Sequence, residues 1–554
     1  MSSTPNTESN PEAHPVWTPA EERALAKLGG VLDRPCSILI VHEHLPRFDA
    51  SGSDMRLLQL VQAYAGAGHR VTVVGRNDLG VAKYRTTLQA LGCEVLAPDP
   101  ERLFWEDSKE PRIDLAQLCA ERQFDVAILF HWYWAGVSVS EQYLPELRRV
   151  SPATRVCVLT DDVHWLREER RAEQEGGRAA LERSRALRVK EHATYARADV
   201  LLTITDDDAQ RIAAEHPGMP MGNLSFCHSS IAEPVPGSVP GFEERSELLF
   251  LGSGVNDANA KAVAWFVENC LPEIRRRLPG VTLRIVGEEP QGGWAGAGDG
   301  VVALGRVDEL EPHLSSARVF VSPVTYGTGL KTKNIQALGS GLPQVLTTIS
   351  AEGMGIAPDA KGDLPAFVCD DPARFAEAVV RLYTERDLWE TTSIASLRHA
   401  QAHFSRERVI ADCEAALRLA LETAPRAYDA ELDELGLPPE IRASKAVQPM
   451  ARVYDGYLKR YHGFKAAGRL EEAQHELRQV LCAFCCWPQE TPVLGEVHTL
   501  LASLYLAASN YEEAAAEAEV ALAHPHVRGR TREVLQGILA LCGASQARSA
   551  GVGA

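Results

Sequence analysis

The sequence predicts two tandem doubly wound α/β domains followed by an all-α domain. Near-continuous runs of valine, isoleucine and leucine, such as residues 37–46, alternate with helical spacers through the first three quarters of the chain. Strands buried on both faces of a parallel sheet have this composition. The alternation breaks at residues 233–241, a linker with three prolines and two glycines, and then starts again. Beyond Pro449 no strand-like run remains.

The first α/β domain is expected over residues 34–235, after a disordered arm over residues 1–33 that contains one short helix from Glu21 to Leu28. A helix is predicted over residues 54–67. The strands of this domain are expected in six apolar runs, at residues 37–46, 69–76, 94–98, 124–134, 154–165 and 200–205.

The second α/β domain is expected over residues 244–425, including return helices after Pro372 and from Ser405 to Thr423. One long helix is predicted from Asn256 to Leu278. Its strands are expected at residues 246–254, 281–289, 301–307, 317–324, 343–350 and 366–371.

The all-α domain, expected over residues 449–545, contains two internal copies. GRLEEAQHELRQVL begins at Gly468 and SNYEEAAAEAEVAL begins at Ser509. Both resemble tetratricopeptide repeats, although their offset exceeds the usual period by about seven residues. A capping helix is predicted from Thr531 to Cys542. A plain helical bundle remains the alternative.

Composition restricts the function classes. The net charge of −18 argues against nucleic acid as a partner, because the phosphate backbone would be repelled. The first fifteen residues are polar and lack the apolar core expected of a signal peptide, and the apolar runs are too short to span a bilayer. Twelve scattered cysteines fit a reducing compartment. We therefore expect a cytoplasmic protein without a transmembrane segment, and peripheral contact with the inner membrane face stays open.

The stretch from Phe320 to Gly353 predicts a strand, a glycine-rich loop, a short helix and a second strand at residues 344–349. Gly327 and Gly329 let the backbone approach a ligand closely, and Lys331 and Lys333 place positive charge at the start of the helix. Backbone N–H groups at a helix start, together with lysine, favour an anion. The stretch therefore predicts a phosphate site. A unit whose loop is glycine-rich without binding anything is the alternative.

The segment SPVTYGTGLKTKNIQALGSGLPQVLTTISAEG resembles the donor-binding segment of the retaining GT-B-fold glycosyltransferases of family 4, the group 1 class. In that family a G-x-G-x-K loop, a helix with an acidic residue and a closing Glu-Gly hold the nucleotide sugar. The resemblance implies two Rossmann-like domains with the ligand in the cleft between them. It departs from the family at Thr328 and Gln336, where two glutamates are usual; an amide still hydrogen-bonds hydroxyls, more weakly than a carboxylate.

The resemblance extends to further residues. It implies donor contacts at Gly252, Ser253 and Asn259 after the first strand of the second domain, and at Glu352. The Ser51–Ser53 loop resembles the glycine loop that faces the donor phosphate, which adds Gly52 to the donor-binding residues.

In the first domain, VLTDDVHWLREERR resembles a segment of the bacterial transferases and gives Asp162 and His164 as catalytic candidates, together with Lys331. A histidine after a strand can contact a sugar hydroxyl or move a proton, and His131 is a second candidate of this kind. Residues 206–208, three aspartates, fit the acidic first turn of a helix better than a metal site. No metal and no cofactor are expected.

The function predicted from these resemblances is transfer of a sugar from a nucleotide-diphosphate sugar to an acceptor hydroxyl, with retention and without a metal. The acceptor is a glycan, a lipid-linked molecule or a protein, and the helical repeats offer a surface for a protein partner. A degenerate transferase that acts as a scaffold through its repeats is the first alternative, favoured by Gln336. A nucleotide-sugar epimerase of the same fold is the second.

Overall fold

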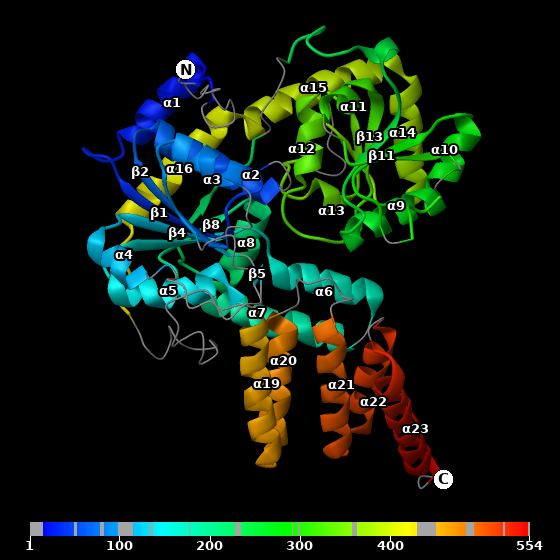
Figure 1. Ribbon diagram of the computed structural model, residues 1–554. Helices are drawn as coiled ribbons and strands as arrows, with labels where there is room; N and C mark the ends of the chain where they lie inside the picture. Colours follow the sequence, from blue (N-terminus) through cyan, green and yellow to red (C-terminus); the bar gives the residue numbers. More distant parts are fainter. Residues whose placement is uncertain are drawn as a thin grey trace, which may run out of the picture. The chain divides into compact units, whose positions relative to one another are not determined.

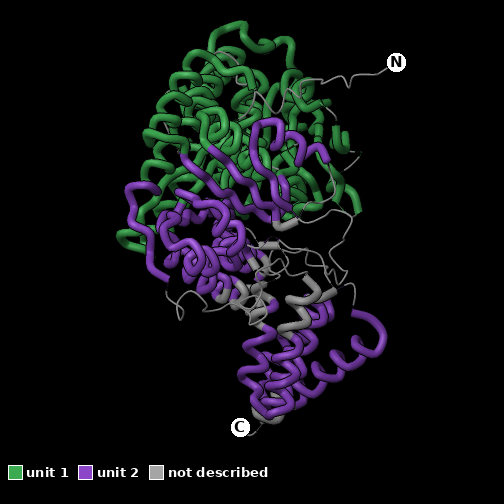
Figure 2. Tube along the Cα trace, turned by 60° about the vertical axis from the view of Figure 1, so that its left-hand side comes forward, with its two compact units in different colours: residues 1–35, 46–69, 202–419 green, residues 36–45, 70–201, 420–554 purple. Residues whose placement is uncertain are grey.

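The computed structural model describes residues 15–48, 52–77, 82–97, 113, 115–131, 133–134, 137–176, 178–227, 234–290, 292–296, 298, 300–307, 309–356, 363–428, 450–483, 492–524 and 527–551. The chain forms two compact units, each built from separated segments (Figure 2). Unit 1 comprises residues 1–35, 46–69 and 202–419; unit 2 comprises residues 36–45, 70–201 and 420–554. Because the units interleave along the chain, the domain limits drawn from the sequence stay predictions. Ser51 and most of the predicted arm, residues 1–14, lie outside the described residues.

The first sheet has seven strands in the order β3-β2-β1-β4-β7-β8-β9; β1, β2, β4 and β8 are labelled in Figure 1. The pairs β1–β2, β1–β4, β2–β3 and β4–β7 are parallel, and Ile40 of β1 lies opposite Val73 of β2 and Ile128 of β4. The boundary between the units falls inside β8. The strands are β1 Ser37–His44, β2 Arg70–Asn77, β3 Glu94–Leu96, β4 Val126–His131, β7 Arg155–Thr160, β8 Val200–Thr203 and β9 Met221–Asn223.

Sequence reasoning predicted six of these seven strands and missed β9. The predicted strand at residues 124–134 ends at His131, and the short β5 Tyr133–Trp134 instead pairs antiparallel with β6 Val137–Ser138. The predicted strand at residues 154–165 ends at Thr160, because a helix begins at His164. The helices of this part are α1 Pro19–Gly29, α2 Gly52–Gly66, α3 Ala82–Ala90, α4 Leu115–Glu121, α5 Val139–Val150, α6 His164–Glu175, α7 Arg178–Tyr195 and α8 Asp206–Glu215.

The second sheet, in unit 1, has six parallel strands in the order β12-β11-β10-β13-β14-β15. Both sheets therefore share the strand order of a Rossmann-like domain. Alternate side chains of β10 enter different cores: Phe250 packs with α9 and α14, whereas Leu249 packs with α11 and α12. The strands are β10 Ser246–Leu251, β11 Leu283–Val286, β12 Val301–Gly305, β13 Ala317–Ser322, β14 Gln344–Leu346 and β15 Phe367–Val368.

One predicted helix and one predicted strand of this domain are longer than the elements that the structure contains. The long helix expected from Asn256 to Leu278 is broken at Cys270, because Pro272 enters the first turn of a new helix. The strand expected to reach Ile349 stops at Leu346, because Thr347 accepts a hydrogen bond from the backbone of Ser350 and caps a short helix. The helices are α9 Asp257–Asn269, α10 Leu271–Arg277, α11 Glu311–Ser316, α12 Thr332–Gly339, α13 Thr348–Ala351, α14 Pro372–Thr384, α15 Arg386–Phe404 and α16 Arg406–Glu422; η1 Phe242–Glu244 precedes β10.

The C-terminal part is all-helical and repeats itself with the predicted offset. The helices are α19 Met450–Ala466, α20 Leu470–Ala483, α21 Pro492–Ala507, α22 Tyr511–Ala523 and α23 Gly529–Gly551 (Figure 1). Gly468 and Ser509, equivalent turn residues of the two copies, both have a positive φ, 73° and 59°. Buried Ala473 and Leu477 of α20 correspond to buried Ala514 and Ala518 of α22. None of the described helices has the length and apolar composition needed to cross a bilayer.

One buried guanidinium ties the linker to the second sheet. Arg245 is 1% exposed and donates hydrogen bonds to backbone oxygens of Pro240, Leu314, Ala317 and Ser340. Its guanidinium also lies over the ring of Trp389, 5.5 Å from the centroid. Burial lowers the pKa of Arg245 to about 10, so the group stays charged at neutral pH.

The substitution Arg245→Met is expected to lower the free energy of unfolding of unit 1 by about 3 kcal/mol, because it leaves several buried carbonyl oxygens without donors. Urea unfolding measures the loss. Arg398→Met, which changes an exposed arginine of α15, should leave the transition unchanged. Equal transitions for Arg245→Met and the wild type would show that these hydrogen bonds contribute little.

Candidate active site

The predicted donor residues follow the two strands at the switch point of the second sheet. The strand order reverses between β10 and β13, and ligands of doubly wound sheets bind beyond the carboxyl ends of the strands at such a point. Gly252 and Ser253 follow β10, and the glycine loop from Pro323 to Lys331 follows β13. The structure thus brings the two predicted donor loops to one edge of the sheet.

The start of α12 offers backbone donors to an anion. Lys331 is the N-cap residue and supplies no side-chain hydrogen bond to the first turn, so the initial N–H groups have no side-chain cap. Gly327 and Gly329 have φ of 136° and 67°, values that favour glycine. The Lys331 ammonium donates to the backbone oxygens of Thr328 at 3.3 Å and Gly329 at 2.8 Å. Lys331 therefore stabilises the conformation of the loop and also contributes positive charge to it.

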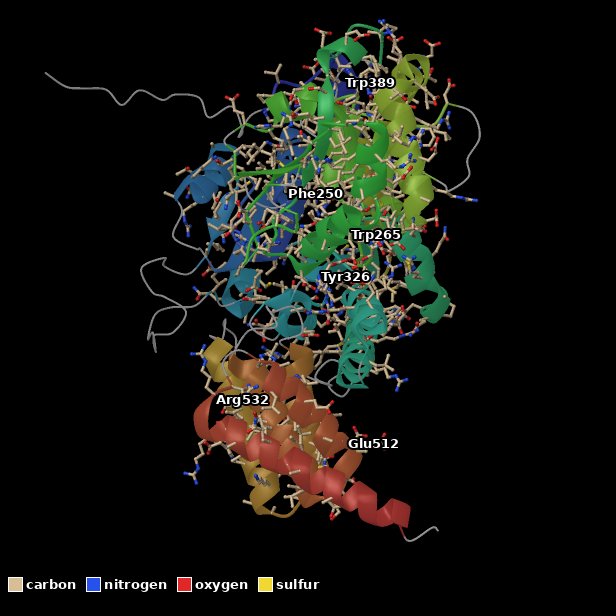
Figure 3. The ribbon with its side chains drawn as sticks, turned by 90° about the vertical axis from the view of Figure 1, so that its right-hand side faces the viewer. Phe250, Trp265, Tyr326, Trp389, Glu512 and Arg532 are labelled. Carbon is tan, nitrogen blue, oxygen red and sulfur yellow. The ribbon has the colours of Figure 1, made fainter. Side chains whose placement is uncertain are left out.

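Lys333 links this helix to the first donor loop. Its Nζ donates to Oδ1 of Asn259 at 2.7 Å and lies 4.3 Å from the ring centroid of Phe250 (labelled in Figure 3). Nδ2 of Asn259 in turn donates to the backbone oxygen of Ser253 at 2.9 Å. Burial, and secondarily the charge of Lys331, lowers the pKa of Lys333 to about 7. Groups with pKa values shifted in this way cluster at functional sites.

Gly252 is required where the first loop meets Asn259. A Cβ at Gly252 would lie 2.8 Å from Cγ of Asn259, closer than real contacts allow. Asn259 is thus enclosed between Gly252, Ser253 and Lys333, and its amide has one fixed orientation. The predicted donor residues of this loop form one hydrogen-bonded unit.

Gly52, the predicted glycine-loop residue, lies against the start of α12. A Cβ at Gly52 would lie 2.6 Å from Cγ2 of Thr332, the first helical residue between the two lysines. Gly52 is itself the first residue of α2. Two helix N-termini therefore meet at Thr332, and both favour negative charge.

Glu352 is bound to α8 in this structure. Its Oε1 accepts a hydrogen bond from Arg211 at 2.8 Å, and the next N–H, of Gly353, donates to Asp207 at 2.9 Å. Thr205 caps α8 with the three aspartates of residues 206–208 in its first turn, as predicted. Glu352 is thus a structural contact here, and its predicted donor contact stays a prediction.

Gln336 lies one turn into α12. Its side chain is half-buried and makes no hydrogen bond among the described residues. The amide therefore remains available to a hydroxyl. In the glycine loop, Tyr326 donates to Asp257 of α9, which also pairs with Lys261 at 2.9 Å.

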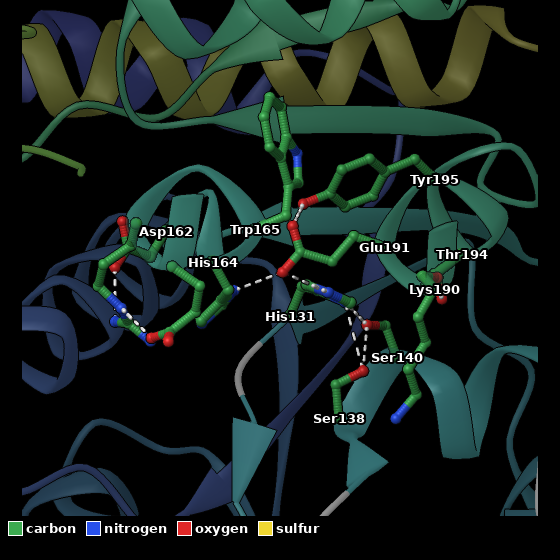
Figure 4. A network of polar contacts seen from close by, with 12 residues as sticks. His131, Ser138, Ser140, Asp162, His164, Trp165, Lys190, Glu191, Thr194 and Tyr195 are labelled. Carbon is green, nitrogen blue, oxygen red and sulfur yellow. Dashed lines mark hydrogen bonds and ion pairs between the residues drawn. The ribbon is translucent and has the colours of Figure 1, made fainter. Parts of the chain in front are cut away.

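In unit 2 the structure gathers His164 and His131 around a carboxylate that the sequence did not single out (Figure 4). Oε1 of Glu191, on α7, lies 3.0 Å from Nδ1 of His164 and 3.9 Å from Nε2 of His131. The three side chains have no exposed surface. The ring of His164 is therefore enclosed and does not line an open site, and its catalytic role stays a prediction.

Polar groups surround this cluster. Nδ1 of His131 lies 2.5 Å from the hydroxyl of Ser140 and 3.3 Å from that of Ser138, and Tyr195 donates to Oε2 of Glu191 at 3.1 Å. Burial lowers the pKa of His131 well below its ordinary value, helped by the charges of His164 and Lys190. Burial also raises the pKa of Glu191, against the hydrogen bonds from His164 and Tyr195.

Asp162, the other predicted catalytic residue of this segment, is partly accessible. Its carboxylate accepts a hydrogen bond from Arg167 at 2.9 Å, and 13% of the side chain is exposed. The pair joins the loop after β7 to α6. Asp162 is thus oriented by Arg167 at the surface.

Sequence reasoning missed several residues of these sites, because their positions in the sequence gave no indication of a functional role. Glu191 and Arg211 lie in the middle of helices, where charged residues are usually solvated. Thr332 lies between Lys331 and Lys333, and its own side chain carries no charge that would indicate a phosphate site. Only Tyr326 carried a cue, as an aromatic residue within the glycine loop.

Two family models match the chain. Residues 245–385 match the model described as "Glycosyl transferases group 1", and residues 51–223 match the "Glycosyl transferase 4-like domain". A search of the curated proteins found no match. These matches and the two Rossmann-like sheets define the class: the chain is a glycosyltransferase with a group 1 domain and a glycosyltransferase 4-like domain.

Solved structures with a similar fold include a sucrose-phosphate synthase from Thermosynechococcus elongatus, with 16% identity, a TM-score of 0.48, and coverage of 68% of this chain and 96% of that one. A glycosyltransferase from Rickettsia africae has 9% identity and a TM-score of 0.47, covering 70% and 99%. The Anabaena protein HepE, in complex with UDP and glucose, has 13% identity and a TM-score of 0.46, covering 68% and 97%.

Proposed function

We propose that the protein transfers a sugar from a nucleotide-diphosphate sugar to an acceptor hydroxyl, and that the donor diphosphate binds at the start of α12. The observation that carries this proposal is the partly buried Lys333, which lies beside a helix N-terminus that has no side-chain cap and donates to Asn259. Because burial lowers the pKa of this lysine to about 7, its charged form lowers the stability of the folded protein when no anion is bound. A bound diphosphate would compensate for that cost.

The chemistry follows from the charges. When the bond between the sugar C1 and the diphosphate oxygen breaks, negative charge grows on the leaving diphosphate. The N–H groups of α12 and the ammonium groups of Lys331 and Lys333 stabilise that charge, which is the work a metal ion performs in other transferases. The proposal is therefore transfer without a metal at the diphosphate. Retention of the anomeric configuration rests on the family resemblance.

Slow hydrolysis of the donor, with water as acceptor, tests both features without knowledge of the natural acceptor. Proton NMR identifies the anomer of the free sugar that forms first. An α-linked donor should release the α-sugar, at an undiminished rate in EDTA. Release of the β-sugar would exclude retention, and loss of hydrolysis in EDTA that magnesium restores would exclude metal independence.

Donor affinity should depend on pH through Lys333. Its pKa is about 7 in the free protein, and a bound diphosphate raises it. Affinity should therefore be constant below pH 7 and fall by up to about tenfold per pH unit above it, because binding then requires proton uptake. Calorimetry with the intact nucleotide sugar measures this. Lys333→Arg should show a flat profile, since the guanidinium stays charged. A flat wild-type profile would contradict the assignment.

Gln336 favours the second candidate, a degenerate transferase that acts as a scaffold. In the family an acid stands there, and the half-buried amide of this chain gives a weaker hydrogen bond to hydroxyls. Gln336→Glu should leave turnover within about threefold if the site is adapted to glutamine. A gain of about 100-fold or more in donor hydrolysis would show a decayed site and support the scaffold.

The acceptor is proposed to be a glycan, a lipid-linked molecule or a protein. Support for a protein partner comes from the helical repeats: α19 to α22 form two hairpins with equivalent buried positions, the arrangement of repeat domains that bind other proteins. The tetratricopeptide assignment belongs to this proposal.

A further inference from the structure

The buried cluster of His131, His164 and Glu191 has the chemistry of a metal centre. One ligand atom from each residue lies within 4.8 Å of those of the other two, and Oε1 of Glu191 faces Nε2 of His131 and Nδ1 of His164. Two imidazole nitrogens and one carboxylate oxygen form a ligand set that zinc takes in proteins. The residues come from three separate elements: the end of β4, the start of α6 and the middle of α7.

The outer contacts orient each ligand atom inward. Ser140 and Ser138 lie on Nδ1 of His131, so that Nε2 points at the carboxylate. Tyr195 holds Oε2 of Glu191, so that Oε1 faces both imidazoles (Figure 4). Metal-ligating histidines and carboxylates usually have such partners on their outer atoms.

The distances distinguish a metal centre from a simple ion pair. Glu191 and His164, 3.0 Å apart, would satisfy an ion pair between them. Such an ion pair does not need the imidazole of His131. Nε2 of His131 nevertheless points at the same oxygen from 3.9 Å, which is too far for a hydrogen bond. Ligand atoms around a tetrahedral zinc ion with bonds of about 2.1 Å lie roughly 3.4 Å apart. The two observed distances bracket that value.

We propose that His131, His164 and Glu191 bind one divalent transition-metal ion of the zinc class, with a water molecule or hydroxide as a further ligand. The ion would fasten the α6–α7 pair to β4 inside unit 2. Its role is structural, because the ligand atoms are enclosed. The proposal does not depend on the proposed donor site, whose residues belong to unit 1.

The test uses the full chain, purified without a histidine tag and freed of metal with a chelator. Zinc titration, followed by calorimetry and elemental analysis, should show about one ion per chain and a rise in melting temperature. Glu191→Gln and His164→Gln should lower zinc affinity by at least about 100-fold, and Ser140→Ala by about 10- to 100-fold. His192→Gln, beside Glu191 but outside the cluster, should bind zinc like the wild type.

Cobalt(II) gives a readout that needs no variant, in case a ligand substitution prevents folding. Wild-type protein should give the intense visible absorption of four- or five-coordinate cobalt bound by nitrogen and oxygen. The weak spectrum of hydrated cobalt, together with no saturable zinc binding by folded protein, would overturn the proposal. Zinc binding that survives in Glu191→Gln and is lost in His192→Gln would overturn it equally.

Discussion

Replacing Lys333 with methionine is expected to stabilise the protein against unfolding and, at the same time, to abolish donor binding. In the unfolded chain the lysine pKa is near its ordinary value of 10.5, and in the folded protein it is about 7. Between these values the unfolded state binds more protons, so stability rises as pH rises from 7 to 10.5. Below pH 7 the lysine is charged in both states, and the folded state bears the full free-energy cost of holding that charge. At about 1.4 kcal/mol per pH unit, the cost amounts to a few kcal/mol.

Methionine keeps most of the apolar stem beside Phe250 and removes the charge. Urea unfolding at pH 6 should therefore show a gain of about 2 kcal/mol, reduced from the full cost because Asn259 loses its hydrogen bond. The gain should shrink toward pH 10. Donor binding should fall by more than about 100-fold, because the diphosphate loses a partly buried cation. Lys27→Met, at an exposed position of α1, is the matched control. A less stable Lys333→Met, or one that still binds the donor, would contradict this assignment.

The substitution Gly52→Ala is expected to lower kcat/KM for donor hydrolysis by about 100-fold, without unfolding the protein. The new methyl group would lie 2.6 Å from Cγ2 and 3.2 Å from Cβ of Thr332, so the first residue of α12 must move by several tenths of an ångström. Displacements of about 1 Å at a reacting centre cost rates of that order. Thr332 stands between Lys331 and Lys333, so both ammonium groups are displaced with it.

A second substitution shows whether this clash is the cause. Thr332→Gly removes both the methyl group and the Cβ, so Gly52→Ala combined with Thr332→Gly should recover most of the activity that Thr332→Gly retains alone. Gly241→Ala, where the new methyl would meet only the end of Glu244 at 3.6 Å, should have no effect. Additive losses in the double variant would show that Gly52 acts in some other way.

The sequence predicted the two sheets and the helical repeats because their signals are local and repeated. Leu248 to Leu251 are apolar on both faces of β10, and this composition alone predicts a strand covered by helices on both sides. The internal copies that begin at Gly468 and Ser509 repeat in the structure as well, because both residues have a positive φ in equivalent turns. The break at Cys270 was missed because the apolar period continues across it, although Pro272 offered the cue.

The site was predictable in its residues and less so in their roles. Lys331 ranked first in the sequence because it follows the glycines, but its ammonium turns back to the loop carbonyls. The case for Lys333 rests on its partial burial and on its hydrogen bond to Asn259, which lies 74 residues earlier in the chain, so neither is visible in the local sequence. His164 stood in a family-like segment, and only the fold shows that Glu191 encloses it.

The central claim, that the donor diphosphate binds at the start of α12, is tested most directly by thermal unfolding with UDP-, GDP-, TDP- and ADP-sugars. The wild type, Lys331→Ala and Lys333→Met are compared. At about 100 times its dissociation constant, the matching donor should stabilise the wild type by about 2.7 kcal/mol. One nucleotide should produce this shift, and both variants should lose it. An equal shift in the wild type and both variants, or no shift with any nucleotide sugar, would contradict the claim.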